Sequence, residues 1–369
     1  MRFVFRVDAS TEIGSGHVIR CLTLATELRR QGHECIFICR EHFGHLGELI
    51  GARRFTVHLL PNPRESTYRD DVLNWNRHAD WLQVHWEEDA VQSLSVLTVY
   101  KNIDWLVVDN YALDIHWEQR VRAQTRRILV IDDLADRLHE CDILLDQNVI
   151  GDDAVDTYKA LVNASCSLLL GPCYALLAPE YKMLAQALPE RDGVIARVLV
   201  FVGGSDPNHL TERYLQALTS DKFAHLFVDV VVGKNHPNPE AVRKLVTARL
   251  RTRLYCGLPS LAVLMVRADI MLGAGGTTNW ERLCLGLNSV VVSVAHNQHA
   301  INKTLADKHL IEFLGDIEQV SVEKISSKIE SLLSNSDVVQ KRSNAMRKVV
   351  DGLGVTKVVE KMLGNYYGA

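Results

Sequence analysis

Residues 2–31, RFVFRVDASTEIGSGHVIRCLTLATELRRQ, decide the fold of this chain. Residues 2–7 are a short apolar run rich in valine and phenylalanine, which is typical of a buried strand. After a turn with two glycines, residues 18–31 predict a helix, and Gly32 predicts its C-terminal cap. The apolar positions of that helix recur at helical spacing: Val18, Cys21, Leu22, Ala25 and Leu28. A strand followed by a turn and a helix predicts βαβ units and a parallel sheet.

The same alternation continues through the first half of the chain. The intervening segment 62–104 begins as a polar turn and continues as a helical segment with three tryptophans, Trp75, Trp81 and Trp86. We interpret these tryptophans as contacts between helix and core rather than as platforms for a sugar. Further strands are predicted at Cys35–Cys39, Thr56–Leu60, Trp105–Asp109, Ile128–Ile131 and Ile143–Leu145.

A second, similar alternation follows residues 171–196, which contain three prolines, two glycines and a charge cluster and predict a linker. Its strands are predicted at Arg197–Val202, Leu226–Val232, Leu254–Cys256, Asp269–Leu272 and Val290–Val294, and the region 320–364 has a helical pattern. The sequence therefore predicts an α/β protein of two doubly wound, Rossmann-like lobes facing each other across a cleft. We assign residues 1–170 to the N-terminal lobe and 197–369 to the C-terminal lobe. Ligands should bind at the carboxyl ends of the strands.

Composition excludes several classes of protein. The 369 residues are 47% hydrophobic and 23% charged, and 41 Lys+Arg against 45 Asp+Glu give a net charge of −4. That balance argues against a nucleic-acid partner. No segment is long enough for a membrane span, and the N-terminus is not a signal peptide, so we expect a cytoplasmic protein. The eight cysteines and fifteen histidines lack metal-site spacing, so no metal site is predicted.

The turn after the first strand carries the first candidate site. Gly14 and Gly16 permit close approach of backbone N–H groups to an anion, and the helix N-terminus favours negative charge. His17 lies in the first helical turn, where the helix dipole favours the neutral imidazole that can accept a proton from water. His17 could instead only hydrogen-bond the turn. Asp8 could orient the His17 ring or cap the loop.

Three loops of the second half carry the other candidates. Gly204 opens space after a strand, and Asp206 and Pro207 predict the N-cap and first residue of the next helix. The run 273–281, GAGGTTNWE, offers consecutive backbone N–H groups and the Thr277 and Thr278 hydroxyls to an anion. Glu281 could accept both hydroxyls of a ribose, or close a capping box with Thr278. Asn297 and Gln298, which open a further helix, could reach sugar or phosphate oxygens or act as a cap.

Together these residues resemble a family. The arrangement is similar to the GT-B UDP-N-acetylglucosamine transferase of peptidoglycan synthesis. It more closely resembles the UDP-2,4-diacetamido-2,4,6-trideoxy-β-L-altropyranose hydrolases of pseudaminic acid biosynthesis. The matching runs extend from residue 6 to about residue 300: RVDASTEIGSGHVIRCLTLA, WLQVHWEEDA, VVDNYALD, IDDLADRLHECDILLDQN, LLLGPCYALLAPEY, VFVGGSDPNHLT and GAGGTTNWERLCLGL.

The resemblance implies a metal-independent hydrolase, without a cofactor, that releases UDP by attack of water at the anomeric carbon with inversion. It implies that His17 is the base, that Gly276–Thr278 bind the diphosphate and that Glu281 holds the ribose. Leu258 would line the uracil, and Tyr111 and Asn297 would lie near the sugar. The chain departs from the family at Asn110, where a histidine is more usual, and at Gln83, where glycine is usual; we interpret the second departure as conformational.

Two other functions stay open. A UDP-sugar-dependent glycosyltransferase would share the fold. A lipid acceptor would need an apolar and basic patch, for which residues 43–54 are the candidate, although their spacing favours a helix packed on its own sheet. A nucleotide-sugar-binding protein without turnover is the third possibility. No feature indicates a protein partner.

Overall fold

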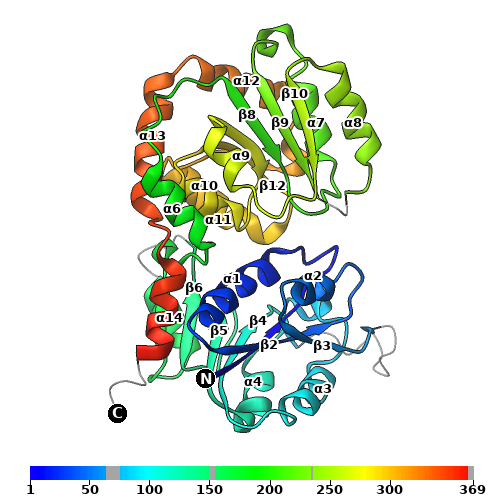
Figure 1. The fold of residues 1–369 in the computed structure, drawn as a ribbon, viewed down its shortest axis with the longest axis vertical. Helices are drawn as coiled ribbons and strands as arrows, with labels where there is room; N and C mark the ends of the chain where they lie inside the picture. The colour runs from blue at the N-terminus through cyan, green and yellow to red at the C-terminus, as the bar shows by residue number, and fades with distance from the viewer. Residues whose placement is uncertain (64–74, 149–153, 234–235, 365–369) are drawn as a thin grey trace. The chain divides into compact units, whose positions relative to one another are not determined.

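The computed structural model describes residues 1–63, 75–148, 154–233 and 236–364. The chain divides into two compact units, residues 1–176 with 354–369, and residues 177–353. Each unit is built on one parallel sheet with helices on its faces (Figure 1). The prediction of two doubly wound α/β units is confirmed.

The sheet of unit 1 has the strand order β3-β2-β1-β4-β5-β6-β7. Its strands are β1 (Arg2–Val7), β2 (Glu34–Arg40), β3 (Thr56–Leu60), β4 (Ile103–Asp109), β5 (Thr125–Ile131), β6 (Ile143–Asp146) and β7 (Ser167–Leu170). Its helices are α1 (Gly16–Arg30), α2 (Gly47–Ala52), α3 (Trp86–Leu97), α4 (Ile115–Val121), α5 (Ala154–Leu161) and α14 (Gly354–Gly364), with 3-10 turns at Ala79–Trp81, Arg122–Gln124 and Pro172–Tyr174. The sequence patterns missed β7, a four-residue strand.

The first helix ends as its sequence predicts. Gly32 has a φ of +85°, its N–H donates to the carbonyl of Arg29, and the N–H of His33 donates to that of Leu28. This is the Schellman arrangement, in which a glycine in the left-handed region closes the helix.

Unit 2 repeats the same topology, with the strand order β10-β9-β8-β11-β12-β13. Its strands are β8 (Arg197–Phe201), β9 (Phe227–Val232), β10 (Thr252–Cys256), β11 (Ile270–Ala274), β12 (Asn288–Ser293) and β13 (Glu312–Asp316). Its helices are α6 (Pro179–Ala187), α7 (Leu210–Ala217), α8 (Pro239–Ala248), α9 (Ala262–Arg267), α10 (Thr278–Cys284), α11 (His296–Asp307), α12 (Val322–Leu333) and α13 (Ser336–Val349), with 3-10 turns at Asp221–Phe223 and Ile317–Gln319.

The units differ from the expected boundaries at two places. Helix α14 belongs to unit 1 rather than to a lobe of residues 197–369, because its apolar stripe Val355, Val358, Val359 and Met362 is buried in the core beneath α1. The predicted linker 171–196 is also not an open connection. Its first residues belong to unit 1, and α6 packs within unit 2 against α9 and α10.

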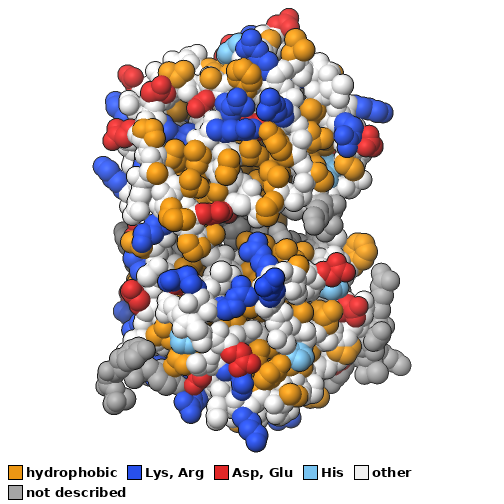
Figure 2. Space-filling view, in the orientation of Figure 1, with side chains coloured by type: hydrophobic (Ala, Val, Ile, Leu, Met, Phe, Trp, Pro, Cys, Tyr) orange, Lys and Arg blue, Asp and Glu red, His pale blue; other side chains and the backbone are white. Residues whose placement is uncertain are grey.

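Within residues 43–54, helix α2 packs on its own sheet, as the spacing favours. Helix α2 buries Ile50 in the unit 1 core and lies on β3, with Leu46 and Leu49 packed beside it. Phe43, by contrast, precedes the helix and is 79% exposed. On the face drawn in Figure 2, basic side chains are interspersed with acidic and apolar ones. Among the described residues, no helix is long and apolar enough to cross a membrane.

A buried charge network supports the unit 1 sheet. Arg6 on β1 and Arg40 on β2 both place guanidinium nitrogens 2.6 Å from the Asp89 carboxylate on α3. The indole N–H of Trp117 on α4 also donates to Asp89, over 3.0 Å. A second carboxylate, Asp8, pairs with Arg6 at 2.7 Å. Buried charges persist only when each is compensated in this way.

We expect Asp89→Asn to lower the free energy of unfolding by about 3 kcal/mol, because both arginines then lose a buried counter-charge. Urea unfolding followed by circular dichroism measures this loss. Asp156→Asn, in an exposed ion pair with Lys159, is the matched control and should change stability by less than about 0.5 kcal/mol. A loss below about 1 kcal/mol for Asp89→Asn would contradict the proposed importance of the network.

Candidate functional site

The residues predicted from sequence gather at equivalent places in the two units. In each sheet the strand order reverses between two neighbours, β1 and β4 in unit 1 and β8 and β11 in unit 2. Open parallel sheets bind ligands at the carboxyl ends of such neighbours. In unit 1 the predicted residues follow β1 and β4. In unit 2 they follow β8, β11, β12 and the edge strand β10.

The turn between β1 and α1 is fixed by its own hydrogen bonds. The Ser10 hydroxyl oxygen accepts the N–H groups of Glu12 and Ile13, at 3.1 and 2.9 Å. The N–H of Gly14 donates to the Ser10 carbonyl at 2.9 Å, with a φ of +80° that favours glycine. Helix α1 then begins at Gly16, so His17 lies in its first turn as predicted.

The His17 ring is held by a carboxylate from a neighbouring strand. Its Nδ1 lies 2.6 Å from Oδ1 of Asp109, the last residue of β4. A carboxylate only accepts, so Nδ1 carries the proton and Nε2 keeps its lone pair. His17 is 8% exposed. The ring is therefore oriented as a general base requires.

Arg20, one helical turn beyond His17, compensates the same carboxylate. Its Nε and Nη2 lie 2.7 and 2.6 Å from Asp109, and its Nη1 lies 2.7 Å from Asp133. Burial alone would raise the pKa of the Asp109 carboxyl, but Arg20 and His17 hold that pKa well below its usual value. Asp109 therefore stays ionised beside the imidazole.

Asp8 does not orient the ring, contrary to one of its two expected roles. Its carboxylate accepts the backbone N–H of Arg40 at 2.6 Å and the side-chain amide of Asn110 at 2.7 Å. The Asp8 carboxylate is thus occupied by Arg40 and Asn110, and it is Asp109 that contacts His17. Asn110, the departure from the family pattern, is a neutral bridge, because its Oδ1 also accepts the N–H of Ala112 at 2.9 Å.

These side chains line a small recess. Its lining residues are Asp8, Ile13, His17, Trp81, Asp109, Asn110 and Tyr111. The rings of Tyr111 and Trp81 stand edge-on to His17, with centroids 4.7 and 6.1 Å away.

Tyr111 and the tryptophans contribute to this recess in different ways. The Tyr111 hydroxyl donates to Asp133 at 2.5 Å, so its apolar ring, rather than its hydroxyl, is presented to the recess. All three predicted tryptophans pack against the unit 1 core as expected, and Trp81 additionally lines the recess. Gln83 has a φ of +58°, which agrees with a conformational reason for the usual glycine.

In unit 2, the loop after β11 contains Gly276, whose φ of +107° favours glycine. Helix α10 begins at Thr278 with Thr277 as its N-cap, and no side chain caps it. The capping box of Thr278 and Glu281 is therefore not formed. Instead the Glu281 carboxylate hydrogen-bonds the hydroxyl of Tyr181 on α6. Burial raises the pKa of the Glu281 carboxyl to about 7, although the Tyr181 hydrogen bond lowers it.

The remaining candidates lie around this loop. The Ser260 hydroxyl donates to Glu180 on α6 at 2.5 Å, which ties the loop bearing Leu258 to the helix of Tyr181. Leu258 itself follows β10, is 37% exposed and is separated from β8 in the sheet by β9. Gln298 Oε1 accepts the N–H of Val294 at 3.1 Å and so closes the start of α11, whereas Asn297 is exposed.

The loop of Gly204, between β8 and α7, differs from its prediction in one detail. Helix α7 begins at Leu210 rather than at Pro207. Asp206 still caps it, because its carboxylate accepts the N–H groups of Leu210 and Thr211 at 3.0 and 2.8 Å. Asp206 has a φ of +49°, so the chain turns once more before the helix starts.

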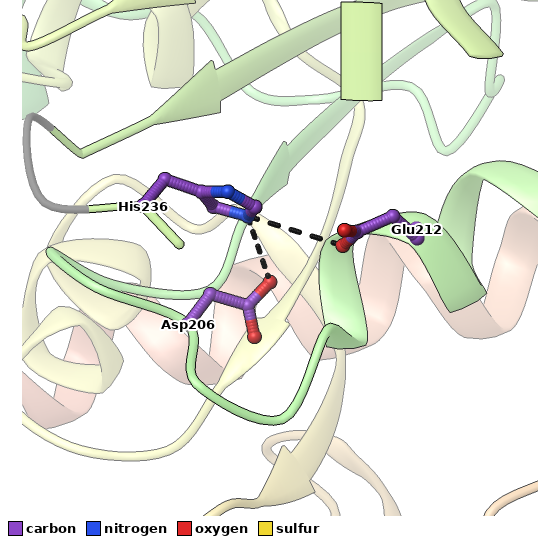
Figure 3. A group of neighbouring side chains, drawn as sticks. All are labelled: Asp206, Glu212 and His236. Atoms are coloured by element: carbon purple, nitrogen blue, oxygen red, sulfur yellow. Dashed lines mark ion pairs between the residues drawn. The ribbon is translucent and has the colours of Figure 1, made fainter. Parts of the chain in front are cut away.

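One group of described side chains has metal-ligand proximity: Asp206, Glu212 and His236 (Figure 3). His236 Nε2 lies 3.6 Å from Asp206 and 3.9 Å from Glu212. However, His236 Nδ1 accepts the backbone N–H of Asn238 at 3.2 Å. A neutral ring then carries its proton on Nε2, whereas a metal needs the lone pair of that atom. We therefore interpret the group as a loop contact between β8–α7 and β9–α8.

Comparisons with known proteins agree with this architecture. No family model matches the chain. The solved structures that resemble it include MurG of Acinetobacter baumannii, with a TM-score of 0.64 and 15% identity over 98% of this chain and 99% of that one. CalG4, the calicheamicin glycosyltransferase, matches with a TM-score of 0.60 and 15% identity over 99% of this chain and 98% of that one. The fold is GT-B.

The sequence also resembles several curated proteins. The UDP-2,4-diacetamido-2,4,6-trideoxy-β-L-altropyranose hydrolase of Campylobacter jejuni is 24% identical over 309 residues, 84% of this chain and 97% of that protein. The spore coat polysaccharide biosynthesis protein SpsG of Bacillus subtilis is 30% identical over 164 residues, 44% of this chain and 48% of that protein. The resemblance to the hydrolase thus extends over most of the chain and is confirmed.

The raised pKa of Glu281 predicts a pH dependence of stability. Its folded pKa of about 7 lies above the ordinary value of 4.5, so between these pH values the unfolded chain ionises first and stability falls as pH rises. Glu281→Gln keeps an acceptor for Tyr181 but cannot ionise. We therefore expect the free energy of unfolding of the variant, relative to that of the parent chain, to rise by about 2 kcal/mol from pH 5 to pH 8. Urea unfolding at each pH measures this difference. If the difference in free energy of unfolding between variant and parent were the same at pH 5 and pH 8, the raised pKa of Glu281 would be contradicted.

Proposed function

We propose that this protein is a hydrolase that releases UDP from UDP-2,4-diacetamido-2,4,6-trideoxy-β-L-altropyranose, giving the free sugar for pseudaminic acid synthesis. The observation that carries the proposal is the His17 ring, held by Asp109 through Nδ1 at the recess after β1. The resemblance to the Campylobacter jejuni hydrolase, which spans 84% of this chain, supports it independently.

In this proposal His17 Nε2 takes a proton from water as the water oxygen attacks the anomeric carbon. The C–O bond to UDP breaks, and its electron pair leaves on the β-phosphate oxygen. A single displacement of this kind inverts the configuration at the anomeric carbon. Asp109 stabilises the imidazolium that forms, as carboxylates do in other histidine-based sites. UDP is a good leaving group, so no second carboxylic acid is needed to protonate it.

The unit 2 loops would hold the nucleotide. The resemblance assigns the diphosphate to the amides and hydroxyls of Gly276–Thr278 and the ribose to Glu281, with Gly204 leaving space for the phosphates. Thr277 and Thr278 are partly exposed, and neither side chain is used as a helix cap, which leaves both hydroxyls for a ligand. Leu258 would line the uracil, and Gln298 would support the loop. Tyr111 and Asn297 would lie near the sugar, and the Gly14–Gly16 turn would position His17.

Purified protein should release UDP from this sugar nucleotide in the presence of chelator and without an acceptor. His17→Ala should lower kcat by about 100-fold or more, because it removes the base, while UDP affinity stays within about twofold. A coupled assay for UDP and calorimetric UDP binding measure the two quantities. His116→Ala, at a surface histidine of the same unit, should retain full activity.

The same assay separates the alternative functions. Release of UDP only after an acceptor is added would identify a glycosyltransferase. UDP binding without turnover of the substrate would identify a binding protein. Full activity of His17→Ala would overturn the proposed base. Mass and NMR analysis of the sugar formed in ¹⁸O-labelled water identifies the bond that is cleaved and the anomeric configuration.

Asp109 should act as a positioning residue for His17. Asp109→Asn preserves shape but favours the wrong imidazole tautomer, so kcat should fall by about 100-fold while KM changes little. Asp104→Asn, on the same strand but at its amino end, is the control and should keep both kcat and KM. A loss confined to KM would contradict this role.

A further inference from the structure

Two thiols in unit 1 are in direct contact. The sulfur atoms of Cys141 and Cys166 are 3.5 Å apart, and all eight cysteines of the chain are free. Cys141 precedes β6 and Cys166 precedes β7, and these strands are neighbours in the parallel sheet. The pair therefore lies at the amino ends of the strands, at the edge of the sheet opposite to His17.

Backbone contacts on both sides hold the two sulfurs in register. Before Cys141, the N–H of His139 donates to the carbonyl of Leu161 at 2.8 Å. After it, the N–H of Ser167 donates to the carbonyl of Asp142 at 2.9 Å. The side-chain amide of Asn163 also donates to the carbonyl of Cys141 itself, at 3.1 Å. The proximity of the thiols is thus fixed by the sheet rather than by mobile side chains.

The two thiols differ in access and in acidity. Cys141 is buried, whereas Cys166 is partly exposed and follows the exposed residues Ala164 and Ser165. The hydrogen bond between the two thiols lowers the pKa of Cys166, against the opposing effect of burial. The same contact, with burial, raises the pKa of Cys141. Cys166 is therefore the thiol that a reagent meets first and the better thiolate.

We propose that Cys141 and Cys166 form a reversible disulfide when the protein meets a low-molecular-weight disulfide such as oxidised glutathione. The Cys166 thiolate attacks one sulfur of the reagent, and the first glutathione thiolate leaves. Cys141 then loses its proton and attacks the Cys166 sulfur of the mixed disulfide, which releases the second glutathione thiolate. Two protein thiols are oxidised by two electrons, and one disulfide reagent is reduced to two thiols.

The disulfide would close a loop of about 25 residues that contains β6 and α5. Closing such a loop restricts the unfolded chain, so the oxidised protein should be more stable than the reduced one. The pair is independent of the proposed hydrolase reaction, because neither cysteine contacts the recess around His17.

The test treats native full-length protein with oxidised glutathione, quenches it with acid, alkylates the remaining thiols and digests it with trypsin. We expect the peptide Leu138–Lys159 joined to Ala160–Lys182, with a mass 2 Da below the sum of the two. The second peptide also contains Cys173, so Cys173→Ser and Cys166→Ser are a matched pair of variants. The first should keep the joined peptide, and the second should lose it. Dithiothreitol should separate the two peptides again.

Thermal unfolding gives a second readout. Oxidation should raise the unfolding midpoint of the parent chain and of Cys173→Ser by about 5 °C, with no rise for Cys166→Ser. A joined peptide that persists in Cys166→Ser would assign the reactivity to Cys173. Glutathione attached to Cys166 without progress to the joined peptide would overturn the proposal, as would complete recovery of all eight alkylated thiols after oxidation.

Discussion

The Asp109 carboxylate is the interaction on which the candidate site depends. It ends a fully buried strand, and a buried carboxylate is tolerated only when it is paired and hydrogen-bonded. His17 and Arg20, both on α1, supply those contacts, so one ionised group fixes the first turn of the helix against β4. Arg20 then continues to Asp133, which accepts the Tyr111 hydroxyl. The orientation of the imidazole and the position of Tyr111 in the recess wall therefore both depend on the ion pairs between Arg20 and the two carboxylates.

One carboxylate is shared between a histidine and an arginine. The guanidinium of Arg20 lies 3.3 Å from His17 Nδ1 and donates to Asp109 through two of its nitrogens. Because a carboxylate only accepts, the neutral ring of His17 carries its proton on Nδ1. Arg20 keeps the carboxylate in place, so Asp109 can fix the tautomer of His17.

Local patterns predicted every strand except β7 and β13, the first helix with its glycine cap, and the position of His17, because each depends on residues near in sequence. Contacts between distant segments were not accessible in that way. Asp109 was inside a predicted strand, but nothing in VVDNY indicates that its carboxylate, rather than that of Asp8, meets His17. The Tyr181–Glu281 contact joins segments 100 residues apart, so local sequence could not distinguish it from a capping box. The apolar stripe of α14 predicted a buried helix but could not specify which of two cores it enters.

The two units have the same strand order through their first six strands but different chemistry at equivalent positions. After β1 and β4, unit 1 places an imidazole, carboxylates and a guanidinium, all fixed by one another. After β8 and β11, unit 2 places glycines, two threonine hydroxyls and a carboxyl group whose pKa burial raises to about 7. A loop built from amides and hydroxyls suits an anion, which it can approach closely without bringing a fixed negative charge. An oriented imidazole suits proton transfer. The shared strand order alone would allow either unit to bind an anion or to carry a base. The difference in side chains therefore supports the proposal that unit 1 supplies the base and unit 2 binds the nucleotide.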